Sequence, residues 1–347
     1  MVNSVNVGLV GTGRFGRLIL SVLKDNSDVN IVAICNRSQD KVIKTASEFS
    51  VPDYFTNYND MLEKKSLDAC FVVTDEDSHA EIAIAALNAG CHVYVEKPLA
   101  TSTEAGKKVR STAIQKGLQI QVGYILRFVP ENAYLKTEID KGNFGKIGSI
   151  RVKRNCSRQW FHDFGKRINL VYETGCHDID LILYLTGQTG KKVYATQRNI
   201  LGYENSDLIT AMLELSDGTQ CFLETSWLAP DMAPVNIAGA LELAGVIDSE
   251  IEIIGELQTA RSRLLDSSLQ IWSDTEVRRP DLALWPYLHG KVAGALKAEI
   301  DHFISCIRDN RESDVQSIDQ AIEVMCIADA VVDSAQSGRE VYINENI

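Results

Sequence analysis

Hydrophobic and polar residues alternate in the first third of the chain in a way that is typical of strands followed by helices. Residues 5–10 form a continuous apolar run. A glycine-rich turn follows, and then an amphipathic pattern with Leu18, Ile19 and Leu23 on one face. The same succession continues through strands at 29–35, 69–73, 92–95 and 118–122 and helices at 40–49, 58–65, 78–89 and 103–117. Strands separated by helices favour a parallel, doubly wound sheet, so we predict an α/β domain over residues 1–122.

Extended segments dominate the rest of the chain. A helix is predicted at 130–141, and strands are predicted at 147–155, 192–201, 208–215, 219–227, 235–243 and 250–257. The Ser216-Asp217-Gly218 turn between two alternating runs is a hairpin signal. Two amphipathic helices complete the chain, and the second is predicted to stop at Gly338. We therefore predict an α+β domain over residues 123–347, with a large, mainly antiparallel sheet whose outer face is a candidate for contact between subunits.

Composition and charge exclude several function classes. The chain has 347 residues, a net charge of -12 and a pI near 5.1, which argues against nucleic acid or an anionic membrane as the main partner. No apolar run approaches the roughly 18 residues of a membrane span, and no signal peptide is expected at the N-terminus. The eight cysteines are scattered without a Cys-x-x-Cys pair, so we expect buried free thiols in a reducing cytoplasm.

The turn after the first strand carries a nucleotide-binding signature. Gly11-Thr12-Gly13-Arg14-Phe15-Gly16 has the G-x-G-x-x-G spacing between a strand and a helix. The glycines permit a tight turn and a close approach of a pyrophosphate, whose charge meets the N-terminus of the helix. These residues predict a dinucleotide cofactor; the alternative is a glycine turn without a ligand.

The end of the second strand bears on the choice of cofactor. An acid is typical at this position in NAD-binding proteins, because it holds the ribose 2′-hydroxyl. Here the strand is followed by Asn36, Arg37 and Ser38. The missing carboxylate removes repulsion against a 2′-phosphate, and Arg37 is able to pair with it. NADP(H) is therefore favoured, and NAD(H) stays open because Asn36 is also able to bond a hydroxyl.

The strand at 92–95 ends in Glu96-Lys97-Pro98. Ligands of open parallel sheets bind at the carboxyl ends of the strands, so Lys97 is predicted to reach the site as a cation with three donors. A solvated lysine at a strand end is the alternative. The loop from Thr74 to His79 follows the neighbouring strand, and His79 is expected chiefly to satisfy the end of a helix.

One helix of the second domain combines acids with a histidine. Glu173, His177 and Asp180 stand at i, i+4 and i+7, so they share one face if the segment is helical. A histidine between carboxylates suits a general acid–base role near neutral pH. A surface helix with an ion pair and a divalent metal site are the alternatives; no other cluster has metal-ligand spacing.

A basic, aromatic segment runs from Arg151 to Leu170. It contains six Lys and Arg residues against one acid, for a local charge of +5 (six minus one), and it includes Trp160, Phe161, His162 and Phe164. If 147–155 is a strand, Arg151 and Lys153 share one face and Arg154 takes the other. The segment is either a cover that holds an anionic substrate or a solvated loop or subunit contact.

Four stretches together resemble the glucose–fructose oxidoreductase/inositol dehydrogenase/MocA (Gfo/Idh/MocA) family. They are the glycine turn at 11–16, the run from Ala85-Ala86-Leu87-Asn88-Ala89-Gly90 to Glu96-Lys97-Pro98, Arg127-Phe128-x-Pro130, and Glu173-x-Gly175-x-His177-x-x-Asp180. The resemblance covers essentially the whole chain, and Glu-Lys-Pro is its most specific motif. It implies an N-terminal NAD(P)-binding Rossmann domain followed by a substrate-binding and oligomerisation domain.

The resemblance also implies roles for individual residues. Lys97 would lie beside the nicotinamide, and His177 would take the hydroxyl proton as hydride leaves and return it in the reverse direction. Arg127 matches a position that faces substrate in polyol-oxidising relatives, and Asp180 looks like an orienting acid. Two departures affect these expectations: Glu173 replaces a shorter aspartate, and Thr74-Asp75-Glu76 replaces the Thr-Pro-Asn of many relatives.

These observations predict a cytoplasmic NAD(P)-dependent dehydrogenase acting on a secondary hydroxyl of a cyclic polyol, sugar or sugar derivative. The candidate catalytic residues are Lys97, His177 and Glu173. Cofactor contacts are expected from Gly11 to Gly16, Asn36 to Ser38, Thr74, His79, Glu96 and Lys97, and substrate contacts from Arg127, Asp180, Trp160 and Tyr287. No metal is expected. A homodimer or homotetramer is expected. The alternatives are a non-catalytic nicotinamide-binding sensor or subunit and a sugar–sugar oxidoreductase that retains its cofactor.

Overall fold

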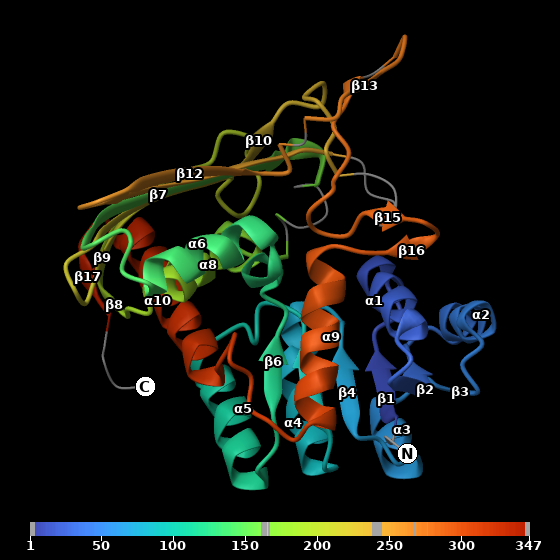
Figure 1. The fold of residues 1–347 in the computed structure, drawn as a ribbon. Coiled ribbons are helices and arrows are strands. Elements are labelled where there is room, and N and C mark those ends of the chain that lie inside the picture. The colour runs from blue at the N-terminus through green and yellow to red at the C-terminus, as the bar shows by residue number, and fades with distance from the viewer. Residues whose placement is uncertain are drawn as a thin grey trace. The chain divides into compact units, whose positions relative to one another are not determined.

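The computed structural model describes residues 4–160, 165, 167–237, 245–266, 268–275 and 277–343 (Figure 1). These residues form two compact units. The first contains the chain up to Ile125 and the segment Tyr287–Ala321; the second contains Leu126–Pro286 and the chain from Ile322 onward. The first break lies close to the predicted boundary at residue 122, but residues 287–321 return to the first unit, whereas the predicted boundary assigns them to the second domain.

The first unit is built on six parallel strands in the order β3-β2-β1-β4-β5-β6, with the strand order reversing between β1 and β4. This is the order of dinucleotide-binding sheets, and it confirms the predicted parallel, doubly wound fold. The strands are β1(Val5–Val10), β2(Val29–Cys35), β3(Asp53–Phe55), β4(Ala69–Val72), β5(His92–Val95) and β6(Ile120–Val122). Only the three-residue edge strand β3 is not among the predicted strands.

The central strands of this sheet are apolar on both faces. Leu9, Phe71 and Val93 are completely buried, as is expected where helices cover both sides of a parallel sheet. Each such side chain contributes roughly 1.5–3 kcal/mol relative to exposure. The connecting helices are α1(Arg14–Asp25), α2(Gln39–Phe49), α3(Tyr58–Lys64), α4(His79–Asn88) and α5(Thr103–Lys116), with a short 3₁₀ turn η1(Glu76–Ser78) before α4.

Helix α9(Ala295–Arg308) completes the first unit. It packs beside α1 and against β1 (Figure 1), and it follows the small hairpin of β15(Tyr287–Leu288) and β16(Lys291–Val292). Leu296, Ile300 and Phe303 on its predicted apolar face are buried. The amphipathic pattern therefore predicted the helix correctly, although not the sheet that it covers.

The second unit carries a seven-stranded sheet in the order β12-β11-β7-β10-β9-β8-β17. All neighbouring pairs are antiparallel except β7 with β10, which confirms the predicted mainly antiparallel sheet. The strands are β7(Ile147–Ser157), β8(Gly190–Arg198), β9(Leu208–Leu215), β10(Gln220–Ala229), β11(Ile247–Gly255), β12(Thr259–Leu264) and β17(Val341–Tyr342). The predicted turn joins β9 to β10, with Gly218 at a φ of 91° that favours glycine.

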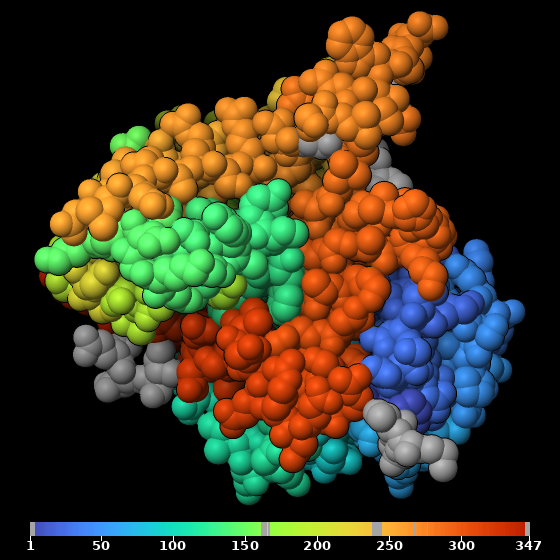
Figure 2. Space-filling view, viewed as in Figure 1, coloured from blue at the N-terminus to red at the C-terminus, as the bar shows by residue number. Residues whose placement is uncertain are grey.

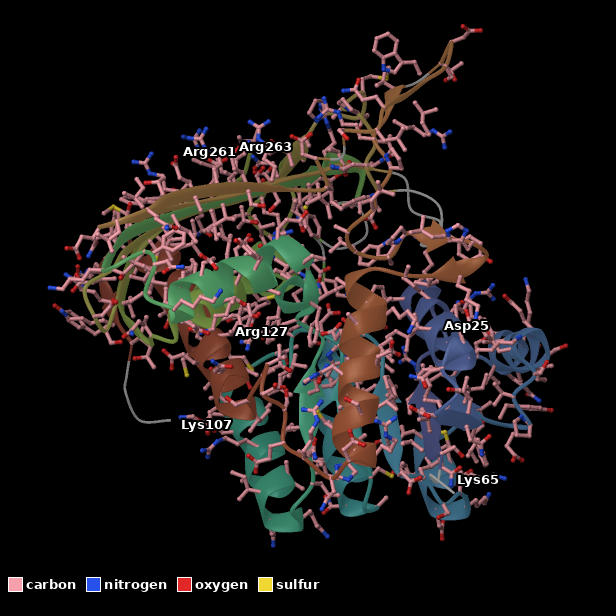
Figure 3. The ribbon with its side chains drawn as sticks, in the orientation of Figure 1. Asp25, Lys65, Lys107, Arg127, Arg261 and Arg263 are labelled. Atoms are coloured by element: carbon pink, nitrogen blue, oxygen red, sulfur yellow. The ribbon has the colours of Figure 1, made fainter. Side chains whose placement is uncertain are left out.

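Helices cover one face of this sheet. Figure 1 shows α6(Pro130–Asp140), α8(Cys176–Thr186) and the C-terminal α10(Ile318–Ser337) on that side. The 3₁₀ turn η2(Ile125–Phe128) leads into α6, and a single π-helical turn, η3(Val171–Gly175), leads directly into α8. The other face is open, and Arg261 and Arg263 of β12 point away from the helices (Figure 3).

Part of one predicted strand lies outside the described residues. Of 235–243, Val235 and Ile237 form isolated bridges to Arg278 and Gly245, and residues 238–244 are not described. The hairpin of β13(Ile271–Trp272) and β14(Val277–Arg278) projects from the surface of the second unit, in orange in Figure 2, with the Trp272 side chain largely exposed.

Candidate active site

The β1–α1 turn has the geometry that a bound pyrophosphate requires. Gly11 has a φ of 102°, and a Cβ there would lie 2.1 Å from the Val73 carbonyl oxygen. A Cβ on Gly16 would lie 1.9 Å from the Gly11 oxygen. No side chain fits at either position, so both glycines are needed to hold the turn against β4 and the start of α1.

Gly13 is different, because nothing lies within 4 Å of the place where its Cβ would be and the residue is exposed. It stands at the N-cap of α1, whose amide groups and dipole favour an anion. The turn is therefore closed toward the protein and open toward solvent, and it fits a dinucleotide whose phosphates approach the backbone.

The residues after β2 form a polar group beside this turn. Asn36 donates from Nδ2 to Thr12 Oγ1 at 2.9 Å and accepts from the Ser38 amide at 2.9 Å, which fixes its side-chain orientation. Arg37 is 91% exposed and lies 3.4 Å from the Asp75 carboxylate. Asp75 thus brings a negative charge to the cation that was predicted to hold a 2′-phosphate.

His79 joins two loops at the carboxyl edge of the sheet. Its ring is buried, with Nδ1 2.7 Å from the Pro98 carbonyl oxygen and Nε2 2.9 Å from that of Thr74. Burial lowers the pKa of His79, and the two carbonyls and Glu76 oppose that shift. The expected helix-capping role is wrong, because Ser78 is the N-cap of α4 and the His79 ring braces loop backbone instead.

Lys97 follows β5 directly and is half-buried. Its backbone amide donates to Glu96 Oε2 at 3.3 Å, and the Lys97–Pro98 peptide bond is cis. Since His79 ties Pro98 to Thr74, the Glu96-Lys97-Pro98 segment and the loop after β4 are held together within the first unit. Lys97 thus stands two residues after β5, at the carboxyl edge of the parallel sheet, and its contact with a ligand there stays a prediction.

In the second unit, Glu173 and His177 lie where the π-helical turn η3 changes into α8. Both side chains are half-buried, and Nδ1 of His177 is shielded from solvent. A π-helical turn inserts one residue relative to regular α-helix, so Glu173 is not held at the regular α-helical offset that the sequence predicts. Such turns are frequent at functional sites.

Asp180 is bound to an arginine. Nη2 of Arg127 donates to Asp180 Oδ1 at 2.7 Å and Nε donates to Oδ2 at 3.0 Å, and both side chains are 0% exposed. Burial raises the pKa of Asp180, and Arg127 opposes that shift. The Arg127 guanidinium also lies 5.1 Å from the ring centre of Tyr184. The substrate contacts expected of Arg127 and Asp180 stay predictions, because the contacts of Arg127 with Asp180 and Tyr184 join residues of the second unit to one another.

A second buried pair holds the other side of α8. Arg154 of β7 donates from Nη2 to Asp178 Oδ1 at 2.7 Å and from Nε to Oδ2 at 3.0 Å, with both side chains 4% exposed. Residues 178 and 180 project from nearly opposite sides of a helix. The Arg154–Asp178 and Arg127–Asp180 ion pairs therefore hold α8 from two sides just after His177. The sequence predicted that Arg154 lies on the face opposite Arg151 and Lys153, and Arg154 is buried there, but nothing in the sequence identified Asp178 as its partner.

Most of the basic segment at 151–170 is neutralised within the second unit. Arg151 lies 4.0 Å from Glu252, Lys153 2.8 Å from Asp248 and Arg158 3.6 Å from Asp231. The local charge of +5 counted along the sequence is therefore offset by acids from other segments. Phe161, His162, Phe164 and Lys166 lie outside the described residues.

The two remaining aromatic candidates lie in different environments. Trp160 is buried against Gly245, where a Cβ would come within 2.2 Å of the indole ring. Tyr287 belongs to β15 in the first unit and is 64% exposed. Neither position tests the substrate contacts predicted for these residues.

Metal and membrane sites were searched over the described part of the chain. No group of three or more His, Cys, Asp or Glu side chains is arranged there to hold a metal ion. Among the same residues, no helix combines the length and the apolar character needed to cross a bilayer. Seven of the eight free cysteines are buried, and burial raises the pKa of Cys35 and Cys91 to about 11.

Comparison with known proteins agrees with this geometry. Residues 5–124 match an oxidoreductase family with an NAD-binding Rossmann fold, and residues 133–261 match the GFO/IDH/MocA C-terminal domain. The 4-carboxy-2-hydroxymuconate-6-semialdehyde dehydrogenase of a Sphingobium species is 30% identical over 64% of this chain and 72% of its own. The scyllo-inositol 2-dehydrogenase (NAD(+)) of Bacillus subtilis is 25% identical over 99% and 98%.

Solved structures show the same fold. The crystal structure of scyllo-inositol dehydrogenase from Lactobacillus casei with bound NAD(H) and scyllo-inositol superposes with a TM-score of 0.81 at 22% identity, covering 98% of this chain and 99% of that one. The fold of this chain is therefore the one seen in that crystal structure.

Proposed function

Since this chain belongs to the Gfo/Idh/MocA oxidoreductase family, we propose that it is a dehydrogenase for a secondary hydroxyl, or the matching carbonyl, of a cyclic polyol, sugar or sugar derivative. The observation that carries the proposal is the position of Glu96-Lys97-Pro98. It lies at the carboxyl edge of a parallel sheet whose first turn, at Gly11 and Gly13, fits a dinucleotide.

When bound, the nicotinamide would supply the hydride acceptor or donor. Lys97 contributes a compact cation with three N–H donors, which orients the reacting oxygen and stabilises negative charge that develops on it. His177 holds the hydroxyl proton during oxidation and gives it back during reduction. Both roles are carried over from the resemblance, and the two residues belong to different units of the chain.

Glu173 would stabilise the protonated form of His177. Its carboxylate stands four residues before the histidine and is half-buried. A neighbouring carboxylate favours the imidazolium and thus suits a histidine that accepts a proton. Glu173 is one methylene longer than aspartate and lies in a π-helical turn, so we expect a pocket whose shape differs from that of aspartate-bearing relatives.

The substrate class comes from the relatives. Scyllo-inositol is the compound named for the Bacillus subtilis and Lactobacillus casei proteins, whereas the Sphingobium relative is named for an aromatic-derived semialdehyde. Full-length similarity to the inositol enzymes favours a polyol or sugar. The offset charge of residues 151–158 removes the main reason to expect an anionic substrate, although Arg167 remains exposed.

For the cofactor we propose NADP(H), with NAD(H) as the alternative. Asn36 removes the acid that repels a 2′-phosphate, and the exposed Arg37 is able to turn toward one. Asp75 favours the alternative, because its carboxylate competes for Arg37. We also propose a cytoplasmic location, which the many buried thiols support.

A homodimer or homotetramer is proposed through the open face of the second sheet. That face has a hollow of about 520 Å³ lined by apolar and charged side chains, among them Tyr194, Met212, Phe222, Arg151 and Glu252. Met212 and Tyr194 are about half exposed, which is costly for a permanent surface. Acids and bases lie side by side there, so the face is complementary to a second copy of itself.

Lys97→Ala tests the catalytic proposal. Turnover should fall by roughly 10²-fold or more, because a positioned donor and cation is lost. Affinity for the nucleotide, measured by titration calorimetry, should change little, and Lys108→Ala on the exposed side of α5 serves as the control. Equal loss of turnover and nucleotide binding would contradict the role given to Lys97. Nucleotide binding without turnover in the native protein would instead support the sensor.

A further inference from the structure

The hydroxyl of Tyr94 lies between two carboxyl groups in the first unit. Its oxygen is 3.0 Å from Glu96 Oε1 and 3.1 Å from Glu299 Oε2. Tyr94 belongs to β5, two residues before Glu96, and Glu299 belongs to α9. Tyr94 is fully buried and Glu299 is 1% exposed, so these two side chains are removed from solvent, and the half-buried Glu96 comes just before Lys97 in the chain.

The number of protons does not match the number of contacts if both acids are ionised. A tyrosine hydroxyl has one hydrogen to donate, and an ionised carboxylate only accepts. Burial above all raises the pKa of Tyr94 well above its usual value, so the phenol keeps its proton. One of the two oxygen–oxygen contacts therefore needs a second proton, which has to reside on a carboxyl group.

The environment indicates which acid holds this proton. Glu299 emerges beside an aromatic cluster, in which Phe71 stacks on Tyr94 at 5.0 Å and Phe303 lies 6.0 Å from Tyr94. An ionised carboxylate is strongly disfavoured in such surroundings. Glu96 is only half-buried and accepts the Lys97 amide, which favours its ionised form.

We propose that Glu299 is a neutral carboxylic acid that donates to Tyr94, and that the chain Glu299–Tyr94–Glu96 positions Glu96 and through it Lys97. The positioning part rests on the proposed function of Lys97. In this order each group donates once: Glu299 to Tyr94, and Tyr94 to Glu96. From β6, the neutral Gln121 side chain donates to the Glu299 backbone carbonyl at 3.3 Å.

Gly123 gives independent support for the tight fit of this chain. A Cβ at this position would lie 2.7 Å from Glu96 Oε1 and 2.8 Å from the Tyr94 hydroxyl oxygen. The backbone of Gly123 therefore closes the space on the far side of the Tyr94–Glu96 hydrogen bond. A side chain at residue 123 would displace the Glu96 carboxyl group, and Lys97 is not among the nearest atoms that it would meet.

Infrared spectroscopy detects the proton on Glu299 directly. At pH 7, Glu299→Gln should remove intensity from the carbonyl-stretch band of protonated carboxylic acids. Burial also raises the pKa of Glu323, so that residue can contribute to the same band. The measured quantity is therefore the difference in band intensity between the wild-type protein and the variant. The matched control Glu312→Gln replaces an exposed glutamate of the same unit and should leave the band unchanged.

Net charge supplies a second readout. Replacing a neutral acid by glutamine leaves the charge of the folded protein unchanged, whereas Glu312→Gln removes one negative charge. Native capillary electrophoresis should therefore show wild-type mobility for Glu299→Gln and a one-charge shift for Glu312→Gln. A one-charge shift for Glu299→Gln with an unchanged infrared band would overturn the proposal. Neither measurement depends on turnover, so failure of the dehydrogenase activity would be a distinct result.

The positioning role is tested by rescue. Glu299→Ala should lower kcat at least tenfold with little change in nucleotide affinity, and Glu299→Gln should restore kcat to within about threefold, because its amide is able to donate to Tyr94. Gly123→Ala should reproduce the kcat defect through a residue outside the chain of donors. Wild-type kcat in Glu299→Ala and in Gly123→Ala, with both variants folded, would refute the positioning role.

Discussion

At the scale of single residues, the pair of Arg37 and Asp75 is the feature that would decide the cofactor. The Arg37 guanidinium is almost fully exposed and makes only a weak contact with Asp75 at 3.4 Å. An exposed pair of this kind is worth at most about 1 kcal/mol, whereas charge-assisted bonds to a phosphate contribute about 1.5–3 kcal/mol. A 2′-phosphate would therefore displace Asp75 from Arg37.

We predict that Arg37→Ala weakens NADP⁺ binding roughly tenfold or more and NAD⁺ binding much less, because only the phosphate is lost as a partner. Asp75→Asn should shift the preference further toward NADP⁺ by removing the competing charge. Steady-state kinetics with both nucleotides measures this, and Lys44→Ala on the exposed side of α2 is the control. Equal effects of Arg37→Ala on both nucleotides would refute the NADP(H) preference.

Individual side chains also show what a sequence is able to reveal. The glycine turn was predictable, since Gly11 and Gly16 are required by backbone contacts within one strand–turn–helix segment. The bracing role of His79 was not, because Pro98 is nineteen residues away and reaches the ring only after β5 has joined the sheet. Backbone geometry within one segment was thus predictable, and contacts between distant segments were not.

At the scale of elements, α8 is the helix that bears the proposed acid–base residue of the second unit. It carries His177 in its first turn and is held by the Arg127–Asp180 and Arg154–Asp178 pairs. Both pairs are bidentate and almost fully buried, so each fixes orientation as well as distance. We infer that these two ion pairs fix the position of His177, which follows an irregular π-helical turn.

Removing one partner of a buried pair leaves an uncompensated charge. Arg154→Met should therefore lower the free energy of unfolding by about 3–5 kcal/mol, whereas Arg154→Met with Asp178→Leu should recover much of that loss. Denaturant titrations of the two variants measure the difference. If the double variant were as unstable as the single one, the burial of an unpaired charge would not be the cause.

One strand that the sequence missed has a clear physical reason. Strand β12 lies at the edge of its sheet, and its alternation of exposed and half-buried residues includes Arg261 and Arg263 in place of an apolar face. These arginines pair with Glu252 and Glu250 of β11. Cross-strand charge pairs stabilise such a strand without the hydrophobic signal from which strands are predicted.

At the scale of the whole molecule, the open face of the second sheet is the surface whose exposure most needs an explanation. Strands whose inner face packs on α6, α8 and α10 present Tyr194, Met212 and Phe222 outward among charged side chains. Stacking the same face of a second chain on it would bury these residues and pair opposite charges by two-fold symmetry.

We predict that Met212→Glu with Phe222→Glu converts the oligomer into a smaller species. Tyr134→Glu, which places a charge at a more exposed aromatic residue of α6 on the other side of the sheet, should leave the oligomer intact. Light scattering coupled to gel filtration gives the masses. A native protein that is monomeric at micromolar concentration would rule out this use of the face.

The order of the parallel strands was within reach of sequence reasoning, because strands separated by helices admit few topologies. The return of residues 287–321 to the first unit was not, since an amphipathic helix indicates that it covers a sheet but not which one. The family resemblance predicts the roles of Lys97 and His177, and the structure adds two buried ion pairs on α8 after His177.

The central claim is that this chain oxidises a secondary hydroxyl with a nicotinamide nucleotide. The most direct test follows reduced-nicotinamide absorbance with NAD⁺ and NADP⁺ in parallel against inositols, aldoses, sugar acids and sugar phosphates. We predict turnover with at least one cyclic polyol or sugar, faster with NADP⁺, and its loss in Lys97→Ala. Nucleotide binding without turnover across the whole panel would contradict the claim and favour a sensor that kept the fold.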